Sequence, residues 1–231
     1  MILQTRARAR LLLALPLAAA TAGPAVATED GQIWANENVT VNLSSKWVLS
    51  EEVTERFSNH KHGLYEFEAN TLLGYRMNKW VTAWAGYTHN PQYSSGDFTA
   101  MEHRAREQVT IDKFAKIGPG VVSARLRAEQ RWRDNADGTG WRLRPFLRYT
   151  IPFRPGGKTG ITFTSEPFFN LNATTFQTKP GLDRMRNVVA FTTPIAKHLA
   201  GEFGYMNQHI FLDGKPDESD HIAWISFNAS L

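Results

Sequence analysis

Residues 123–133 read SARLRAEQRWR, and this alternation of charged and apolar side chains decides the fold class. Residues 141–151 read WRLRPFLRYTI and repeat it, with Arg142, Arg144 and Arg148 on one parity. A period of two places successive side chains on opposite faces of a β-strand. We therefore predict strands with one charged face and one apolar face. Alternation alone does not say which solvent the apolar face meets, so the rest of the chain decides that.

The first 27 residues have the pattern of a secretory signal peptide. Arg6, Arg8 and Arg10 precede a short apolar run that begins at Leu11, and Ala25-Val26-Ala27 supplies a small-residue cleavage site. Pro16 interrupts the apolar run, which disfavours a transmembrane anchor of about 20 residues. We therefore expect a signal peptide at 1–27 and a single domain at 28–231. Removing the three arginines lowers the formal net charge from +4 to about +1, so the charge does not indicate nucleic-acid binding.

Composition is typical of a barrel whose strands carry polar residues on one face. The chain contains no cysteine, which excludes a small disulfide scaffold. The mean hydropathy of −0.37 resembles that of a soluble protein, but a membrane barrel with a polar lumen has a similar value. No apolar run after the signal is long enough for a transmembrane helix.

Strand-like segments follow one another from residue 32 to the end of the sequence. Most have 10–14 residues, which suits a tilted membrane crossing better than a globular strand. We predict an antiparallel transmembrane β-barrel of about 10–12 strands. An ordinary bacterial barrel has an even number, so either a weak strand is missed or the first segment pairs unconventionally. The eleven expected segments are 32–43, 47–57, 64–76, 80–90, 101–114, 121–133, 141–153, 161–172, 182–194, 198–211 and 221–231.

The connections alternate in character along the chain. One set consists mostly of tight turns, at 44–46, 77–79, 117–120, 154–158 and 196–197. The other set is longer or more polar, at 58–63, 91–100, 134–140, 173–181 and 212–220. Short periplasmic turns and longer extracellular loops are typical of a transmembrane barrel.

The apolar parity predicts a lipid-facing band. Aromatic residues near strand ends, such as Trp47, Trp132 and Trp141, are placed where interfacial girdles belong. The outward set is Phe67, Leu73, Tyr75, Val81, Ala83, Ala85, Tyr87, Val109, Ile111, Leu126, Leu143, Leu147, Ile151, Phe163, Phe169, Leu171, Val189, Phe191, Leu199, Phe203 and Tyr205.

Short motifs spread over the chain resemble a known family. They are Gln32-Ile33-Trp34, Gly74-Tyr75-Arg76 before Asn78-Lys79-Trp80, Trp141-Arg142-Leu143-Arg144, Glu166-Pro167-Phe168-Phe169-Asn170 and Gly204-Tyr205-Met206-Asn207-Gln208. The chain thereby resembles the bacterial outer-membrane proteins grouped as domain of unknown function 2490. The resemblance implies an outer-membrane barrel and no particular activity.

The inward parity predicts a charged lumen. We expect a basic wall on three adjacent strands, and we expect Glu52, Glu66, Glu68 and Glu202 to face it from across the lumen. The arginines are Arg104, Arg106, Arg125, Arg127, Arg131, Arg133, Arg142, Arg144 and Arg148, and the acidic partners are Glu52, Glu66, Glu68, Glu129, Glu166 and Glu202.

Two interpretations of this lumen remain open. In the first, guanidinium and carboxylate groups pair and fill the barrel, with Arg127 and Arg144 held by Glu129 and Glu166. In the second, some arginines are free and form a track for anions or acidic oligosaccharides, as in a narrow porin-like channel. A barrel of eight strands leaves no passage and one of sixteen leaves a channel. A barrel of 10–12 strands lies between these cases, so the strand number does not decide between the two interpretations. We favour the filled lumen.

Residues for catalysis or metal binding form no strong motif. Ser58 and His60 suggest a lipid-modifying outer-membrane enzyme as a second alternative, but the longer motifs of such enzymes are missing. His89, His103, His209 and His221 lie at expected strand ends. The acidic run of Asp213, Asp217, Glu218 and Asp220 is irregular for a calcium loop, although it could hold divalent ions loosely with lipopolysaccharide.

The sequence therefore predicts an outer-membrane β-barrel of a Gram-negative bacterium, of unassigned role. We expect no enzymatic activity, no cofactor, no metal and no nucleic-acid partner. Expected partners are outer-membrane lipid, lipopolysaccharide and the barrel-assembly machinery. The last of these would recognise the final strand, whose apolar face resembles the signal for that machinery and carries Ala223, Ile225, Phe227, Ala229 and Leu231.

Overall fold

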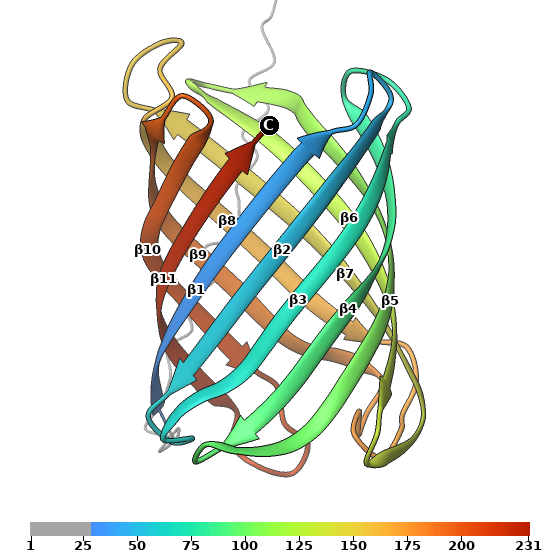
Figure 1. Ribbon diagram of the computed structural model, residues 1–231. Coiled ribbons are helices and arrows are strands. Elements are labelled where there is room, and N and C mark those ends of the chain that lie inside the picture. The colour runs from blue at the N-terminus through green and yellow to red at the C-terminus, as the bar shows by residue number, and fades with distance from the viewer. Residues whose placement is uncertain (1–28) are drawn as a thin grey trace, which may run out of the picture.

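The computed structural model describes residues 29–231 as one closed β-barrel of eleven strands (Figure 1). The expected signal peptide at 1–27 lies outside the described residues. Within 29–231, no helix is long and apolar enough to cross a membrane. The strands are β1 (Glu29–Asn42), β2 (Trp47–Ser58), β3 (Gly63–Arg76), β4 (Val81–Ser94), β5 (Asp97–Ile117), β6 (Gly120–Arg133), β7 (Ala136–Pro152), β8 (Gly160–Asn170), β9 (Gly181–Ala196), β10 (Leu199–Ile210) and β11 (Glu218–Ser230).

Ten neighbouring pairs are antiparallel hairpins, and the eleventh pair closes the barrel differently. β1 pairs with β11 in parallel, from Glu29 opposite Ser219 to Thr40 opposite Ser230. An odd number of up-and-down strands requires this, because the first and last strands then run in the same direction. The expected strand count is confirmed, but the antiparallel prediction does not hold for the closing pair. Of the two explanations offered for the odd count, the unconventional pairing of the first segment is therefore the correct one. No strand was missed within residues 29–231.

The two ends of the barrel differ less in loop length than the sequence suggested. At the β1–β2 end, the connections are 43–46, 77–80, 118–119, 153–159 and 197–198. At the β2–β3 end, they are 59–62, 95–96, 134–135, 171–180 and 211–217. The expected loop at 91–100 is a continuation of β4 and β5, joined through Ser95 and Gly96, which both have positive φ. This two-residue turn matches the twist of a hairpin, so pairing continues almost to its tip.

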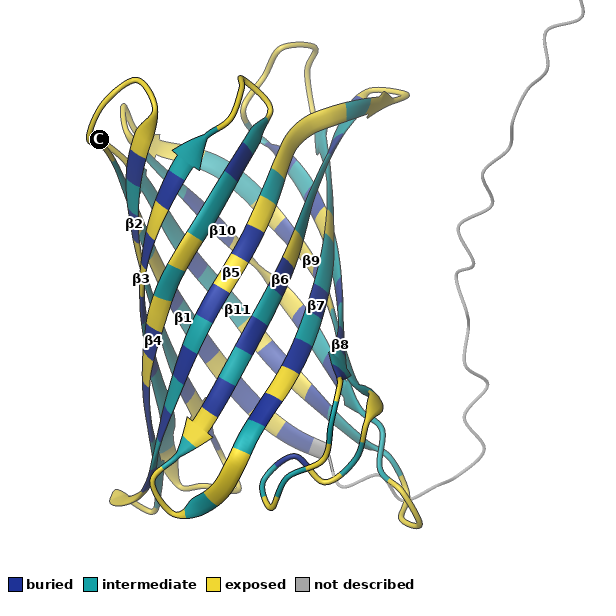
Figure 2. Cartoon of the chain, turned by 90° about the vertical axis from the view of Figure 1, so that its right-hand side faces the viewer, coloured by how far each residue is buried: buried dark blue, intermediate teal, exposed yellow. Residues whose placement is uncertain are grey.

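Burial alternates along each strand, as Figure 2 shows for β5, β6 and β7. Every residue of the predicted outward set is exposed or partly exposed, including Leu126 and Leu147 in mid-strand. Exposed tryptophans lie near both ends, with Trp47 and Trp80 at the β1–β2 end and Trp132 and Trp141 at the other. The exterior is therefore an apolar band between two aromatic belts, as the alternation predicted.

One strip of the exterior departs from this apolar pattern. Glu37, Glu51 and Glu55 face outward from the adjacent strands β1 and β2, and Glu107 does so from β5. Thr71 donates a hydrogen bond to Glu51 at 2.8 Å, and Gln130 donates one to Glu107 at 3.1 Å. Sequence analysis did not single out these outward carboxylates, although their parity places them on this face.

The interior has two sectors. An apolar cluster lines the inner wall around β1 and β9–β11, formed by Trp34, Val188, Ala190, Met206 and Ile222, with Trp224 packed against it. The rest of the wall carries most of the buried charges. The sequence predicted the charged sector and missed the apolar one.

Candidate functional site in the barrel lumen

All the arginines of the predicted basic wall point inward, on β5, β6 and β7. Arg106 is 1% exposed, while Arg125, Arg133 and Arg148 keep partial access to solvent. Each forms at least one ion pair with a carboxylate. The acidic partners Glu52, Glu66, Glu68, Glu129, Glu166 and Glu202 also face the lumen. The predicted pairing of guanidinium and carboxylate groups is therefore present.

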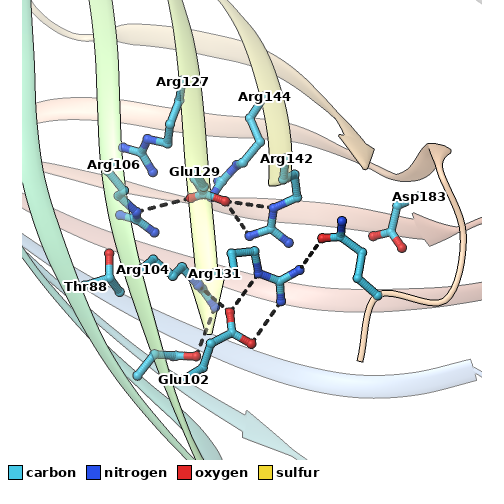
Figure 3. Close-up of polar contacts among 12 residues, drawn as sticks. Thr88, Glu102, Arg104, Arg106, Arg127, Glu129, Arg131, Arg142, Arg144 and Asp183 are labelled. Carbon is cyan, nitrogen blue, oxygen red and sulfur yellow. Dashed lines mark hydrogen bonds and ion pairs between the residues drawn. The ribbon is translucent and has the colours of Figure 1, made fainter. Parts of the chain in front are cut away.

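Glu102 on β5 is a centre of this network that the sequence analysis overlooked. Its fully buried carboxylate accepts hydrogen bonds from Arg104 at 2.6 Å and from Arg131 at 2.9 and 3.0 Å (Figure 3). It also accepts one from Arg133 at 2.6 Å. Glu102 has the same parity as Arg104, so the alternation already placed it inside. Three cations around one carboxylate compensate for the loss of water around it.

Glu129 on β6 is a second centre with three arginine neighbours. Arg142 donates to it at 2.7 Å, Arg144 at 2.8 Å, and the Arg106 Nε atom lies 3.2 Å away (Figure 3). Neither Glu129 nor the Arg106 side chain has solvent access. The two centres tie β5, β6 and β7 together across their inner faces.

Glu68 on β3 is the third centre, and it reaches arginines on both sides. It accepts hydrogen bonds from Arg56 on β2 at 3.0 Å and from Arg104 and Arg106 on β5 at 2.9 and 2.6 Å. β4 lies between β3 and β5, and its inward residues there are small. A Cβ atom at Gly86 would lie 2.1 Å from the Thr71 carbonyl oxygen, so no larger residue fits that position.

Glu66 and Glu68 on β3 therefore contact the basic wall at Arg104 on β5, with only the strand β4 between them. The prediction that they face it from across the lumen was wrong, because strand order and the short side chains of β4 bring β3 and β5 within reach. Glu52 reaches farther, lying 3.5 Å from Arg127 on β6.

The remaining acids hold the arginines nearest the β1–β2 end. Glu166 pairs with Arg125 and with Arg144 at 2.9 Å, and Glu202 accepts a hydrogen bond from Arg148 at 3.2 Å. The prediction for Arg144 is confirmed, since both Glu129 and Glu166 hold it. The prediction for Arg127 was wrong, because its Nε donates to Gln108 at 2.7 Å and it contacts neither acid.

A stack of guanidinium groups and aromatic rings crosses the lumen at mid-height. Arg56 lies 4.3 Å from the centre of the Trp34 ring. Arg186 lies 4.5 Å from the centre of the same ring and 4.6 Å from the centre of the Phe168 ring. Arg144 then lies 4.2 Å from Phe168. Each contact is attractive because the ring face is electron-rich, and more so where water is excluded. Sequence analysis missed this stack, although the parity of each strand places these side chains inside.

Arg186 on β9 differs from the other arginines of the stack. Its Nε donates to Gln208 at 2.7 Å, and Gln208 donates in turn to Asp220 at 2.6 Å. Arg186 forms no ion pair with any carboxylate of residues 29–231, so two rings and one amide hold its charge.

The stack divides the lumen into separate chambers. A chamber of about 390 Å³ extends toward the β1–β2 end, past Asn38, Thr40 and Asn228. A second chamber of about 350 Å³ lies toward the β2–β3 end, beside Asp30, Tyr65 and Asp220. Trp34, Arg56 and Arg186 line both chambers, so these residues form the wall between them.

The 171–180 segment folds over the β2–β3 end of the lumen. Gln177 is 3% exposed, accepts a hydrogen bond from Arg131 at 3.1 Å, and donates to the carbonyl oxygens of Trp141 and Asn172. The Phe176 ring lies 5.0 Å from Arg133. Charged side chains below and a hydrogen-bonded amide above therefore fill this mouth of the barrel over β6–β8.

The candidate catalytic pair does not have the geometry of a nucleophile and its base. Ser58 donates its hydroxyl hydrogen bond to Asp30 at 2.6 Å, and the His60 ring lies 3.9 Å from the same carboxylate. A hydrolase serine needs an adjacent base that takes its proton. Ser58 and His60 share Asp30 as a partner, and no hydrogen bond joins them among the described residues.

The acidic run near the β10–β11 connection is dispersed over different partners. Asp213 pairs with Lys179 at 2.7 Å, whereas Asp220 turns into the lumen toward Gln208. Asp217 accepts hydrogen bonds from the Leu212 N–H and from His209, and the first of these lowers the pKa of Asp217. In residues 29–231, no group of three or more His, Cys, Asp or Glu residues is placed to hold a metal ion.

Comparison with known proteins identifies the family. The model of a family described as protein of unknown function (DUF2490) matches residues 31–219. The chain belongs to this family. An uncharacterized protein of Methylorubrum extorquens is 30% identical, over 92% of this chain and 94% of that protein. No solved structure matches the chain. The DUF2490 resemblance expected from the short motifs is thus confirmed, and neither match names an activity.

Glu102→Gln should destabilise the barrel because it leaves Arg104, Arg131 and Arg133 without their shared charge. Removing one partner from a buried ion pair costs about 3–5 kcal/mol. The matched control is Glu107→Gln on the outer face of the same strand, where the carboxylate accepts a hydrogen bond from the neutral Gln130 side chain. Urea unfolding in detergent should show a large decrease in the free energy of unfolding for Glu102→Gln. For Glu107→Gln, the free energy of unfolding should change by no more than about 0.5 kcal/mol. Equal losses would contradict the central place of Glu102.

Proposed function

We propose that this DUF2490 protein is an outer-membrane β-barrel that binds solute in a blind chamber and does not conduct ions. The observation that carries the proposal is the Arg56–Trp34–Arg186–Phe168–Arg144 stack, which crosses the lumen between two chambers. The salt bridges of Glu68, Glu102 and Glu129 hold the surrounding arginines in place. We propose no catalytic role, because no nucleophile is paired with a base in the sites described above.

The exterior supports a membrane location. An apolar band between two tryptophan belts matches a bilayer with its two interfaces. Outer-membrane lipid and lipopolysaccharide are then the surrounding partners, and the assembly machinery would act on β11.

The runner-up function is a narrow anion channel. The observation that favours it is Arg186, which lies in the stack between the two chambers and has no carboxylate partner among residues 29–231. A channel and a closed barrel differ in one measurable property, the ionic current through the protein.

In planar bilayers, the refolded wild type should give no current steps. The Trp34→Ala/Phe168→Ala variant should give stable steps with anion preference, because removing both rings joins the chambers through a passage lined by arginines. Trp84→Ala is the control, since Trp84 faces the lumen outside the stack and donates to Thr110. Heat-modifiable migration on gels verifies that each variant is folded. Wild-type steps equal to those of the double variant would overturn the closed barrel and support the channel.

Cysteine labelling tests the location and orientation of the barrel, because the chain contains no cysteine of its own. We propose that the β2–β3 end, with the 171–180 and 211–217 segments, faces outward. In intact Gram-negative cells, a membrane-impermeant maleimide should label the Lys215→Cys variant. The Lys158→Cys variant, exposed at the opposite end, should react only after the outer membrane is permeabilised. The reverse pattern would invert the orientation, and labelling of neither variant in permeabilised cells would contradict surface placement of these segments.

A further inference from the structure

The chamber at the β1–β2 end contains buried polar groups without a hydrogen-bond partner among residues 29–231. The Arg127 residue is 3% exposed, and its Nη2 atom is buried without a hydrogen-bond partner. The Oε2 atom of Glu52 lies 3.5 Å from this nitrogen, which is an ion contact without hydrogen-bond geometry. The Trp224 Nε1 atom is also buried and unpartnered. Unsatisfied buried donors are uncommon in folded proteins, because each forfeits its hydrogen bonds to water.

These donors lie on different walls of one chamber. Arg127 is on β6 and Trp224 is on β11, five strands apart around the barrel, and both line the chamber of about 390 Å³. A volume of that order is typical of small-molecule sites. Arg56 Nε and Arg125 Nε, from two further lining residues, are also buried without a hydrogen-bond partner among the described residues. All four of these groups are donors, so a ligand that satisfies them has to present acceptors.

The charge of the lining favours an anion. Arg125, Arg127, Arg148 and Arg186 line this chamber. The carboxylates nearby are engaged: Glu166 by Arg125 and Arg144, Glu202 by Arg148, and Glu68 by three arginines. Arg186 has no carboxylate partner and Arg127 has only the 3.5 Å contact, so positive charge is left over inside the chamber.

The neutral part of the lining suits a ring that carries hydroxyl groups. Indole and phenyl rings offer flat apolar surfaces, and amide and hydroxyl side chains between them can both donate and accept hydrogen bonds. A sugar ring presents the complementary combination of C–H faces and hydroxyl groups. The rings belong to Trp34, Trp84, Trp224 and Phe146, and the amides to Asn36, Asn38, Asn70 and Asn228.

We propose that this chamber binds a small acidic sugar, with its carboxylate directed at Arg127 and its ring between the tryptophans. The inference rests on the proposed closed barrel, because the guanidinium–aromatic stack forms the floor of the chamber. The ligand enters from the β1–β2 end, where Glu52, Arg125 and Arg148 retain partial solvent access.

The test is titration of the full barrel in detergent with D-glucuronate, followed by calorimetry and tryptophan fluorescence. Glucuronate should bind saturably at one site, and D-glucose, which lacks the carboxylate, should bind at least tenfold more weakly. Arg127→Gln should weaken glucuronate binding at least tenfold. Trp224→Phe keeps the ring and removes only the unpartnered N–H, and it should weaken binding by about threefold to tenfold without loss of thermal stability.

Two matched variants outside the chamber serve as controls. Arg133→Gln changes an arginine at the opposite end, which Glu102 holds. Trp132→Phe removes an indole N–H on the exterior, where it donates to Thr139. Both should bind glucuronate like the wild type. Should Arg127→Gln fail to fold, Trp224→Phe still decides the question.

Several results would overturn the inference. The first is that glucuronate does not bind saturably to the folded wild type. The second is that glucose, or inorganic phosphate alone, binds as tightly as glucuronate. The third is that Trp224→Phe binds glucuronate with the affinity of the wild type. Current measurements separate this inference from the closure on which it rests. A silent barrel that ignores glucuronate refutes the acidic-sugar site alone, whereas a conducting wild type refutes the closed barrel.

Discussion

The structure depends on one constraint, which is that a carboxylate taken out of water needs several cations around it. Glu68 illustrates it, since hydrogen bonds from Arg56, Arg104 and Arg106 surround a side chain with almost no solvent access. Desolvating an ion costs several kcal/mol, and only multiple charge-assisted hydrogen bonds offset that loss. Long arginines from neighbouring strands therefore converge on the glutamates, and the barrel interior is cross-linked by side chains.

This cross-linking determines what the lumen can do. The interior of an eight-stranded barrel is just wide enough for side chains to fill it, and a barrel of eleven strands is wider. The strand number alone therefore does not block the lumen. In the proposed closed lumen, the passage is blocked by arginines that the glutamates hold and by Trp34 and Phe168, whose rings lie against guanidinium groups. The apolar cluster behind Trp34 anchors its ring. What remains open is a large chamber on each side of the stack and a cavity of about 80 Å³ among the arginines. Of the two large chambers, the one at the β1–β2 end combines several buried donors without partners with an excess of arginine charge.

Period-two patterning was sufficient to predict much of the fold, since strand positions and the inward direction of residues such as Arg127 follow from parity alone. It did not predict which side chains meet. Glu68 reaches Arg106 across the single strand β4, and Arg186 reaches Trp34 because β1 pairs with β11. Such contacts depend on strand order, register and barrel closure, which no local pattern encodes. Glu102 is different, because it has the same parity as Arg104 and the alternation by itself places it in the lumen.

A double-mutant cycle between Glu68 and Arg106 tests the central claim most directly, namely that the lumen is held by charges that act as one network. The free energy of unfolding would be measured in detergent for the wild type, Glu68→Gln, Arg106→Gln and the double variant. Residues that share a buried network show interaction energies of about 0.5–3 kcal/mol. The 2.6 Å contact and the shared neighbour Arg104 predict a value in the upper half of that range, at or above about 1.5 kcal/mol. Additive losses, with an interaction energy below about 0.5 kcal/mol, would show that the two charges are stabilised independently and would contradict the network.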